Sequence, residues 1–178
     1  ATAIKIASPG VVDVYQGNEL WNYCLVDPDN RTPVDFKLRE NLLKEKANPA
    51  DRDQLKIHYT MKGLLFRRKH KELFIGGDYI PLEVRGPGSR NVIAFIRRHG
   101  NDFALLAALR FFSALNFEKG YSVNSDFWNQ TELILTNDME YPSRLQNIFN
   151  EQFMDIKKQT LRASDLFESG CACMLTNI

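Results

Sequence analysis

The pattern of apolar and polar positions divides the chain into a helical first part and a β-rich second part, with the change near Phe74. Before this point apolar residues recur every three or four positions, as on one face of a helix. After it they fall in short runs rich in β-branched and aromatic residues, bounded by glycine, proline and asparagine. The pattern predicts an α+β fold.

The longest predicted helix begins after Asn48, the expected N-cap, and ends before Gly76-Gly77. Its apolar positions at i, i+4, i+7 and i+8 are Ile57, Met61, Leu64 and Leu65. The basic run at 67–71 is interpreted as a solvated face of this helix. The alternative, a patch that binds anions or nucleic acid, is disfavoured by the balanced charge of the chain.

A shorter helix is predicted upstream, with Thr32 as its N-cap, Pro33 at the first helical position, Asp35 in the first turn and its end near Lys46. Its apolar stripe consists of Leu38, Leu42 and Leu43.

Seven runs in the second part are predicted to be strands: 78–85, 91–98, 103–112, 131–136, 145–149, 160–167 and 171–175. The turn-rich segment 86–89 between the first two indicates a hairpin. Seven strands of this length are enough for an antiparallel β-sandwich of two sheets. The aromatic residues of 114–129 are expected to fill its core or to cap it, and core is the favoured interpretation.

Near the start, the apolar run at 11–15 is too short for a helix and is bounded by Pro9-Gly10 and Gly17, which predicts a strand covered on both faces. The loop that follows is dense in aromatic and hydrogen-bonding side chains, a composition that suits the binding of a sugar. The candidate sugar-binding residues are Gln16, which precedes the turn at Gly17, and Trp21, Asp27, Asp29, Asn30 and Arg31 in the loop.

The chain has 178 residues, 44% hydrophobic content and a formal net charge of +1. It can therefore bury a sizeable core, and it lacks the basic excess that binding to nucleic acid requires. We expect no membrane-spanning segment, because no run is long and apolar enough, and no signal peptide. The missing initiator methionine suggests a piece of a longer protein.

The three cysteines, Cys24, Cys171 and Cys173, lack the spacing of a four-ligand zinc site. A metal could be held by the C-x-C pair, but buried apolar thiols are the favoured interpretation, and neither a metal nor a cofactor is expected. Reduced thiols predict a cytoplasmic protein.

Two stretches resemble a known enzyme family. GVVDVYQGNE at 10–19 is similar to the segment around the eighth barrel strand of the α-amylase family, although Val12 stands where that pattern has proline. The continuation ELWNYCLVDPDNRTPVD resembles the malto-oligosyltrehalose synthases within that family. A second likeness, LFRRKHKELFIGGDYIPL at 65–82, is to the helix and turn that lead into the C-terminal β-domain of the family.

The resemblance implies that residues 1–74 are the last strand and helices of a (β/α)8 barrel and that residues 75–178 form a C-terminal β-sandwich. It implies that the longer protein isomerises the reducing-end linkage of a maltodextrin to a trehalose linkage. The catalytic carboxylates of the family would lie upstream of residue 1, so no catalytic residue is expected here and the chain alone should be inactive. Glu19 is expected to accept a structural hydrogen bond.

The loop after a barrel strand lies at the catalytic face. We therefore expect the six candidate residues named above to hold the reducing-end sugar. The alternative is that they only pin the loop, with a local turn and salt bridge at 29–31 and Trp21 as a packing residue.

Two other functions stay open at this point. One is a related hydrolase or transglucosylase with the same barrel end. The other is a carbohydrate-binding β-module whose platform would be Trp128, Tyr121 and Phe127.

A barrel strand without its neighbours has unpaired edges and uncovered apolar faces. The first 30 residues are therefore expected to be rearranged, disordered or exchanged between copies, whereas the β-sandwich should be intact.

Overall fold

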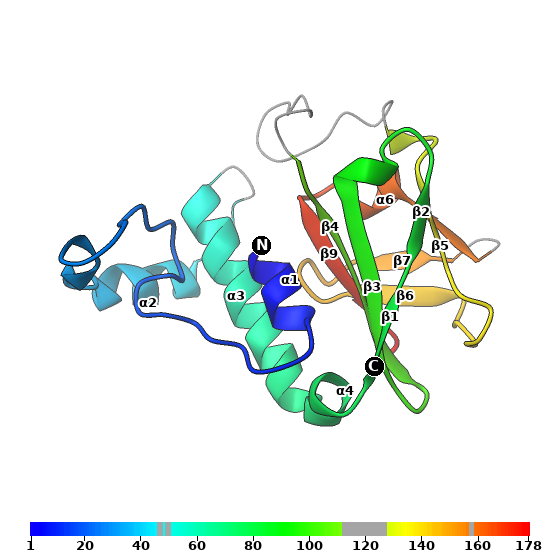
Figure 1. Cartoon of the computed structure of the whole chain (residues 1–178), viewed down its shortest axis with the longest axis horizontal. Helices are drawn as coiled ribbons and strands as arrows, with labels where there is room; N and C mark the ends of the chain where they lie inside the picture. The colour runs from blue at the N-terminus through cyan, green and yellow to red at the C-terminus, as the bar shows by residue number, and fades with distance from the viewer. Residues whose placement is uncertain (46–47, 49–50, 112–127, 157–158) are drawn as a thin grey trace.

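A computed structural model describes residues 1–45, 48, 51–111, 128–156 and 159–178. Helices cover one face of a six-stranded sheet, and a three-stranded sheet lies against the other face (Figure 1). The α-helices are α1 Thr2–Ala7, α2 Phe36–Lys44, α3 Arg52–Lys69, α4 Lys71–Ile75 and α6 Ala163–Leu166, with 3-10 turns η1 Asp29–Arg31 and η2 Ser89–Asn91.

Both sheets are antiparallel throughout their described pairings. The larger has the order β1-β3-β4-β9-β6-β7 and the smaller the order β2-β5-β8. The strands are β1 Asp78–Pro81, β2 Glu83–Arg85, β3 Val92–His99, β4 Asp102–Leu109, β5 Glu132–Ile134, β6 Arg144–Asn147, β7 Phe153–Asp155, β8 Thr160–Arg162 and β9 Ala172–Thr176. This confirms the predicted combination of helices with antiparallel sheets.

The central strands are apolar on both faces because each face is covered. In β4, Phe103 and Leu105 point into the core between the two sheets, whereas Ala104 and Leu106 point into the core beneath the helices. A strand buried on both faces reads as a nearly continuous apolar run, and such runs at 91–98, 103–112 and 171–175 were correctly predicted to contain strands.

Three strand predictions need correction. The run at 78–85 forms two strands that belong to different sheets, and the run at 160–167 turns into α6 after Arg162. Strand β7 was not predicted, because it has only three residues and two of them are exposed. Short edge strands lack the alternation that identifies a strand in a sequence.

The predicted ends and faces of the longer helices were partly wrong. Asp35 is the N-cap of α2 and Asp51 that of α3, each accepting backbone N–H groups, whereas Thr32 lies before α2 and Asn48 before α3. The buried residues of α3 are Leu55, Ile57, Tyr59, Thr60 and Gly63, and Leu65 is 47% exposed. Helix α3 contacts α1 and α2, and its residues Leu55 and Tyr59 pack on the sheet, so one apolar stripe does not describe it.

Candidate functional site

The segment between α1 and α2, residues 8–35, contains the six candidate binding residues and forms no strand. The strand expected at 11–15 is therefore absent, and Val11 is fully exposed. A strand requires a neighbour to pair its backbone groups, and no described segment provides one here. This agrees with the expectation that the first 30 residues rearrange.

The backbone of this segment is held by cationic side chains rather than by a sheet. Arg67 on α3 donates to the carbonyl oxygens of Ile6 at 2.6 Å and Ser8 at 2.9 Å, and also to that of Gly10. Arg67 is thus tied to the end of α1, and the solvated face predicted for the run at 67–71 is wrong for this residue.

Gly17 provides the predicted turn, with a φ of +87°, a conformation that favours glycine. Arg39 on α2 donates to the Gly17 carbonyl at 2.9 Å and to the Glu19 carboxylate at 3.1 Å. Glu19 therefore accepts a hydrogen bond, as predicted. These contacts fix the start of the polar loop against α2.

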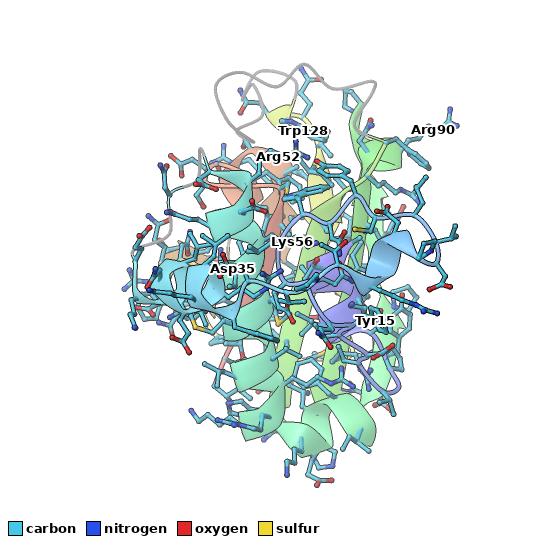
Figure 2. All side chains as sticks on the ribbon, turned by 90° about the vertical axis from the view of Figure 1, so that its left-hand side faces the viewer. Tyr15, Asp35, Arg52, Lys56, Arg90 and Trp128 are labelled. Carbon is cyan, nitrogen blue, oxygen red and sulfur yellow. The ribbon has the colours of Figure 1, made fainter. Side chains whose placement is uncertain are left out.

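Lys56 on α3 holds the next part of the loop. Its Nζ donates to the Leu20 carbonyl at 2.6 Å and to Asn18 Oδ1 at 3.2 Å. Partial burial lowers the pKa of Lys56, while the nearby carboxylate of Asp53 opposes this shift. Figure 2 places Lys56 and Arg52 on the same side of the molecule, next to each other on α3. The sequence contained no signal for these cation contacts, because they join residues about 20 to 60 positions apart.

Trp21 lies against the start of α3. Its backbone N–H donates to the Asp53 carboxylate at 2.8 Å, and its indole Nε1 donates to the Arg52 carbonyl at 3.2 Å. The guanidinium of Arg52 lies 4.2 Å from the ring centroid, a cation–π distance. Trp21 remains 44% exposed and forms part of the wall of a cavity of about 540 Å³ that Lys56 also lines.

The acidic and basic candidates lie further along the loop and are all exposed. Asp27 and Arg31 form an ion pair with a hydrogen bond of 3.0 Å, and the Asp29 carboxylate accepts from the Leu25 backbone N–H at 3.2 Å. This is a local turn with a salt bridge, although Arg31 pairs with Asp27 rather than with Asp29. Such exposed pairs contribute little to stability.

The structure does not bring all six candidates to one place. Trp21 borders the cavity beside α3, whereas Asp27, Asp29 and Arg31 belong to or flank η1 and do not line that cavity. Gln16 is exposed in the turn before Gly17, and Asn30 lies within η1.

Among the described residues, no group of three or more His, Cys, Asp or Glu side chains lies close enough together to hold a metal ion. All three cysteines are free. Burial raises the pKa of the Cys173 thiol to about 12 and raises that of Cys171. Both thiols are therefore protonated and unreactive near neutral pH.

The platform considered for a carbohydrate-binding module is contradicted at Trp128, which is fully buried in the core between the two sheets. A side chain without exposed surface cannot stack on a sugar. Tyr121 and Phe127 lie outside the described residues. No described helix is long and apolar enough to cross a membrane.

No family model matches the chain, but comparison with individual proteins finds relatives. Over 110 residues, 62% of this chain, it is 44% identical to a putative maltooligosyl trehalose synthase of Mycobacterium tuberculosis. The match covers 13% of that relative, so the chain spans only a small part of its length.

Solved structures extend the likeness to nearly the whole chain. The maltooligosyltrehalose synthase of Arthrobacter ramosus matches 98% of this chain with a TM-score of 0.75 and 26% identity, over 21% of its own length. Another maltooligosyl trehalose synthase structure matches 99% of the chain with a TM-score of 0.66 and 25% identity. An α-amylase of Anoxybacillus, at 15% identity and a TM-score of 0.62, shares the fold. The resemblance to the C-terminal region of these synthases is confirmed.

Proposed function

We propose that this chain is the C-terminal part of a malto-oligosyltrehalose synthase. The complete enzyme would convert the reducing-end α-1,4 linkage of a maltodextrin into an α,α-1,1 linkage by intramolecular transglucosylation. The observation that carries the proposal is the 44% identity to a relative of that name over 110 residues. The match of two solved synthases to nearly the whole chain supports it.

In this proposal residues 1–74 complete a (β/α)8 barrel and residues 75–178 form the C-terminal β-domain. The exposed apolar side chains of the first part support this proposal, because barrel segments outside the chain would cover them. They are Val11, Tyr15, Leu25, Val26, Phe36, Leu38 and Leu43. Helix α2 has no buried residue despite its apolar stripe. The rest of the barrel would cover these side chains and pair the backbone at 11–15.

The chemistry itself would be supplied from outside this chain. Breaking and remaking a glycosidic bond with retention needs a nucleophilic carboxylate and a carboxylic acid of raised pKa. Among the described residues, the two carboxyl groups with a shifted pKa are Glu83 and Glu151, and hydrogen bonds from Arg85 and Lys62 lower both values. Neither suits the role of the acid, so the proposal assigns no catalytic residue.

We expect the complete enzyme to remove the reducing ends of maltopentaose with little release of glucose, and the 178-residue chain to do neither. The measurement follows reducing ends and free glucose side by side. Glucose or maltose release by the complete enzyme would favour the alternative, a related hydrolase or transglucosylase. Activity in the chain alone would show that it contains the catalytic carboxylates.

For the chain's own part, we propose that the loop with Trp21 and Asn30, and with the exposed Gln16, Asp27, Asp29 and Arg31, borders the reducing-end subsites. An indole face can stack on a sugar ring, and carboxylate and guanidinium groups can bond its hydroxyls. The cation contacts of Arg39, Lys56 and Arg67 would hold this loop in place.

The unpaired thiols also support a cytoplasmic location for the complete enzyme.

Trp21→Ala or Asp29→Ala in the complete enzyme is expected to increase the ratio of hydrolysis to isomerisation by about tenfold, because a poorly held glucose is lost to water. The control is Glu40→Ala, which removes an exposed carboxylate from α2. A ratio that stays the same in both loop variants would mean that these residues only pin the loop.

A further inference from the structure

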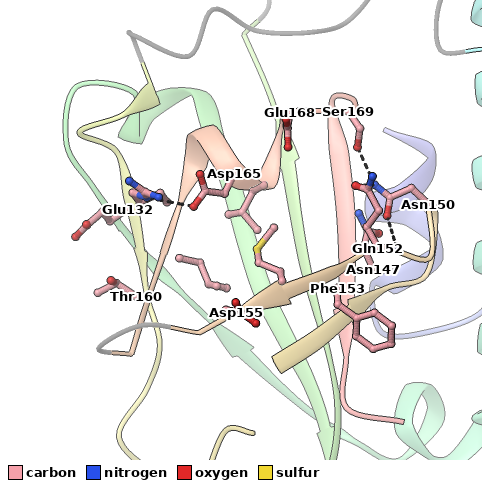
Figure 3. Close-up of a pocket in the computed structure, with 14 residues that line it drawn as sticks. Glu132, Asn147, Asn150, Gln152, Phe153, Asp155, Thr160, Asp165, Glu168 and Ser169 are labelled. Carbon is pink, nitrogen blue, oxygen red and sulfur yellow. Dashed lines mark hydrogen bonds and ion pairs between the residues drawn. The ribbon is translucent and has the colours of Figure 1, made fainter. Parts of the chain in front are cut away.

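A groove of about 540 Å³ opens between the two sheets at strands β7 and β8 (Figure 3). All three residues of each strand line it. In the described pairings β7 is bonded only to β6 and β8 only to β5, so the groove lies between the last strands of the two sheets. We call it the inter-sheet groove. Its volume falls within the usual range for small-molecule sites.

The charge of the described lining disfavours anionic ligands. Among the residues that the structure describes, the lining includes one cation, Arg162, and four carboxylates, those of Glu132, Asp155, Asp165 and Glu168. Arg162 is already bonded to Asp165 at 3.1 Å. A metal ion is disfavoured too, because no group of three or more acidic, histidine or cysteine side chains in the described ranges could hold one. The lining therefore favours an uncharged polar ligand.

Several hydrogen-bonding groups remain available to such a ligand. The carboxylates of Glu132 and Glu168 form no hydrogen bond or ion pair with another described residue, so they can accept from hydroxyl groups. Asn150 Nδ2 donates to Gln152 Oε1 at 3.0 Å and to Ser169 Oγ at 2.8 Å. This arrangement orients Gln152 with its Nε2 left as a donor. Acceptors and a donor thus line one groove.

An exposed aromatic ring completes the lining. Phe153 on β7 is 56% exposed, and the guanidinium of Arg144 lies 4.5 Å from its ring centroid. Arg144 also faces Asp155 at 3.7 Å, which restrains the guanidinium over one side of the ring. The other side can pack against the apolar face of a sugar. Figure 3 shows Phe153 at one end of the lining, on the same side as Gln152 and Asn150, with Glu132 and Thr160 at the opposite end.

We propose that the inter-sheet groove binds a neutral oligosaccharide. The choice of a maltodextrin as that oligosaccharide rests on the proposed function. Phe153 packs on one glucose ring, with Gln152 as a donor near it, and Glu132 and Glu168 accept from hydroxyls of other glucose units along the groove. The β-domain would then hold a segment of the same polymer whose end the complete enzyme rearranges.

Calorimetric titration of the 178-residue chain with maltoheptaose tests the proposal. Phe153→Ala is expected to weaken binding at least about fivefold, from the loss of a ring contact. Glu168→Gln is expected to weaken it about tenfold, from the loss of a charged acceptor. The matched control is Phe111→Ala, which removes another exposed phenylalanine beside an arginine but outside the groove and should bind as the unchanged chain does. Circular dichroism checks that each variant is folded.

Absence of maltoheptaose binding would overturn the proposal, and so would binding that Trp21→Ala abolishes but the two groove variants preserve. Self-association through the strand edges without affinity for sugar would overturn it as well. The synthase proposal has a separate readout. If the complete enzyme released glucose while the groove variants lost affinity for maltoheptaose, the groove proposal would be supported and the synthase proposal contradicted. If the complete enzyme released no glucose while the groove variants kept their affinity, the synthase proposal would be supported and the groove proposal contradicted.

Discussion

Trp128→Ala is expected to lower the free energy of unfolding by about 4 kcal/mol, the usual cost of truncating a fully buried aromatic side chain. Trp128 has no exposed surface and packs among the residues of both sheets. Its ring centroid lies 6.1 Å from that of Phe167. A Cβ atom added at Gly88 would lie 2.2 Å from the Trp128 ring, so the backbone there is closely fitted to the indole.

Urea unfolding followed by circular dichroism measures this effect. Trp21→Ala is the control, because Trp21 is 44% exposed and its loss should cost about 1 kcal/mol, mainly from one hydrogen bond. If Trp128→Ala stayed as stable as the unchanged chain but lost affinity for maltodextrin, Trp128 would be a sugar platform after all and its burial here would be wrong.

Arg97→Met is the second large effect, with an expected loss of about 3 kcal/mol. The Arg97 side chain is almost fully buried, and its guanidinium donates to three backbone carbonyl groups. Nη2 bonds Phe74 at 3.1 Å and Gly77 at 2.6 Å, and Nε bonds Asp78 at 3.1 Å. Methionine would fill the space but leave these acceptors, one buried and two partly buried, without the Arg97 donor.

Arg97 therefore joins the end of α4 to the start of β1, where the helical part of the chain passes into the sheets. Burial lowers the pKa of its guanidinium, but an arginine remains charged near neutral pH.

Arg98→Met is the matched control for Arg97→Met in urea unfolding. Arg98 is the next residue along β3 and forms a partly exposed ion pair with Asp78 at 3.1 Å. Its replacement should cost about 1 kcal/mol or less. Equal losses in the two variants would contradict the role of the buried carbonyl contacts.

The strand predicted at 11–15 is absent because no described segment of this chain pairs with it. The run at 11–15 has the composition of a buried strand, yet Val11 is fully exposed. A strand depends on partners that come from elsewhere in the sequence. In the proposed longer protein, segments outside this chain would bury the run; within this chain no described segment does.

Prediction of local structure near the site succeeded where a short motif carries the information. The turn at Gly17 and the hydrogen bond accepted by Glu19 were predicted, and both occur. The role of the six loop residues stays a prediction, as does the domain boundary between residues 74 and 75. The inter-sheet groove could not have been predicted. Its two sides belong to different sheets, and no short sequence motif indicates how two sheets pack against each other.

The sequence by itself determined the placement of helices before the antiparallel strands, the turn at Gly17 and the continuous apolar character of β3, β4 and β9. These features depend on neighbouring residues and on the periodicity of one element. Only the tertiary structure decided that α1, α2 and the sheet would all pack against α3 and that 78–85 would divide between two sheets. It also decided that Arg39, Lys56 and Arg67 would hold the loop. Those outcomes depend on which distant segments meet, because burial and hydrogen bonding are satisfied by whichever groups the fold brings into reach.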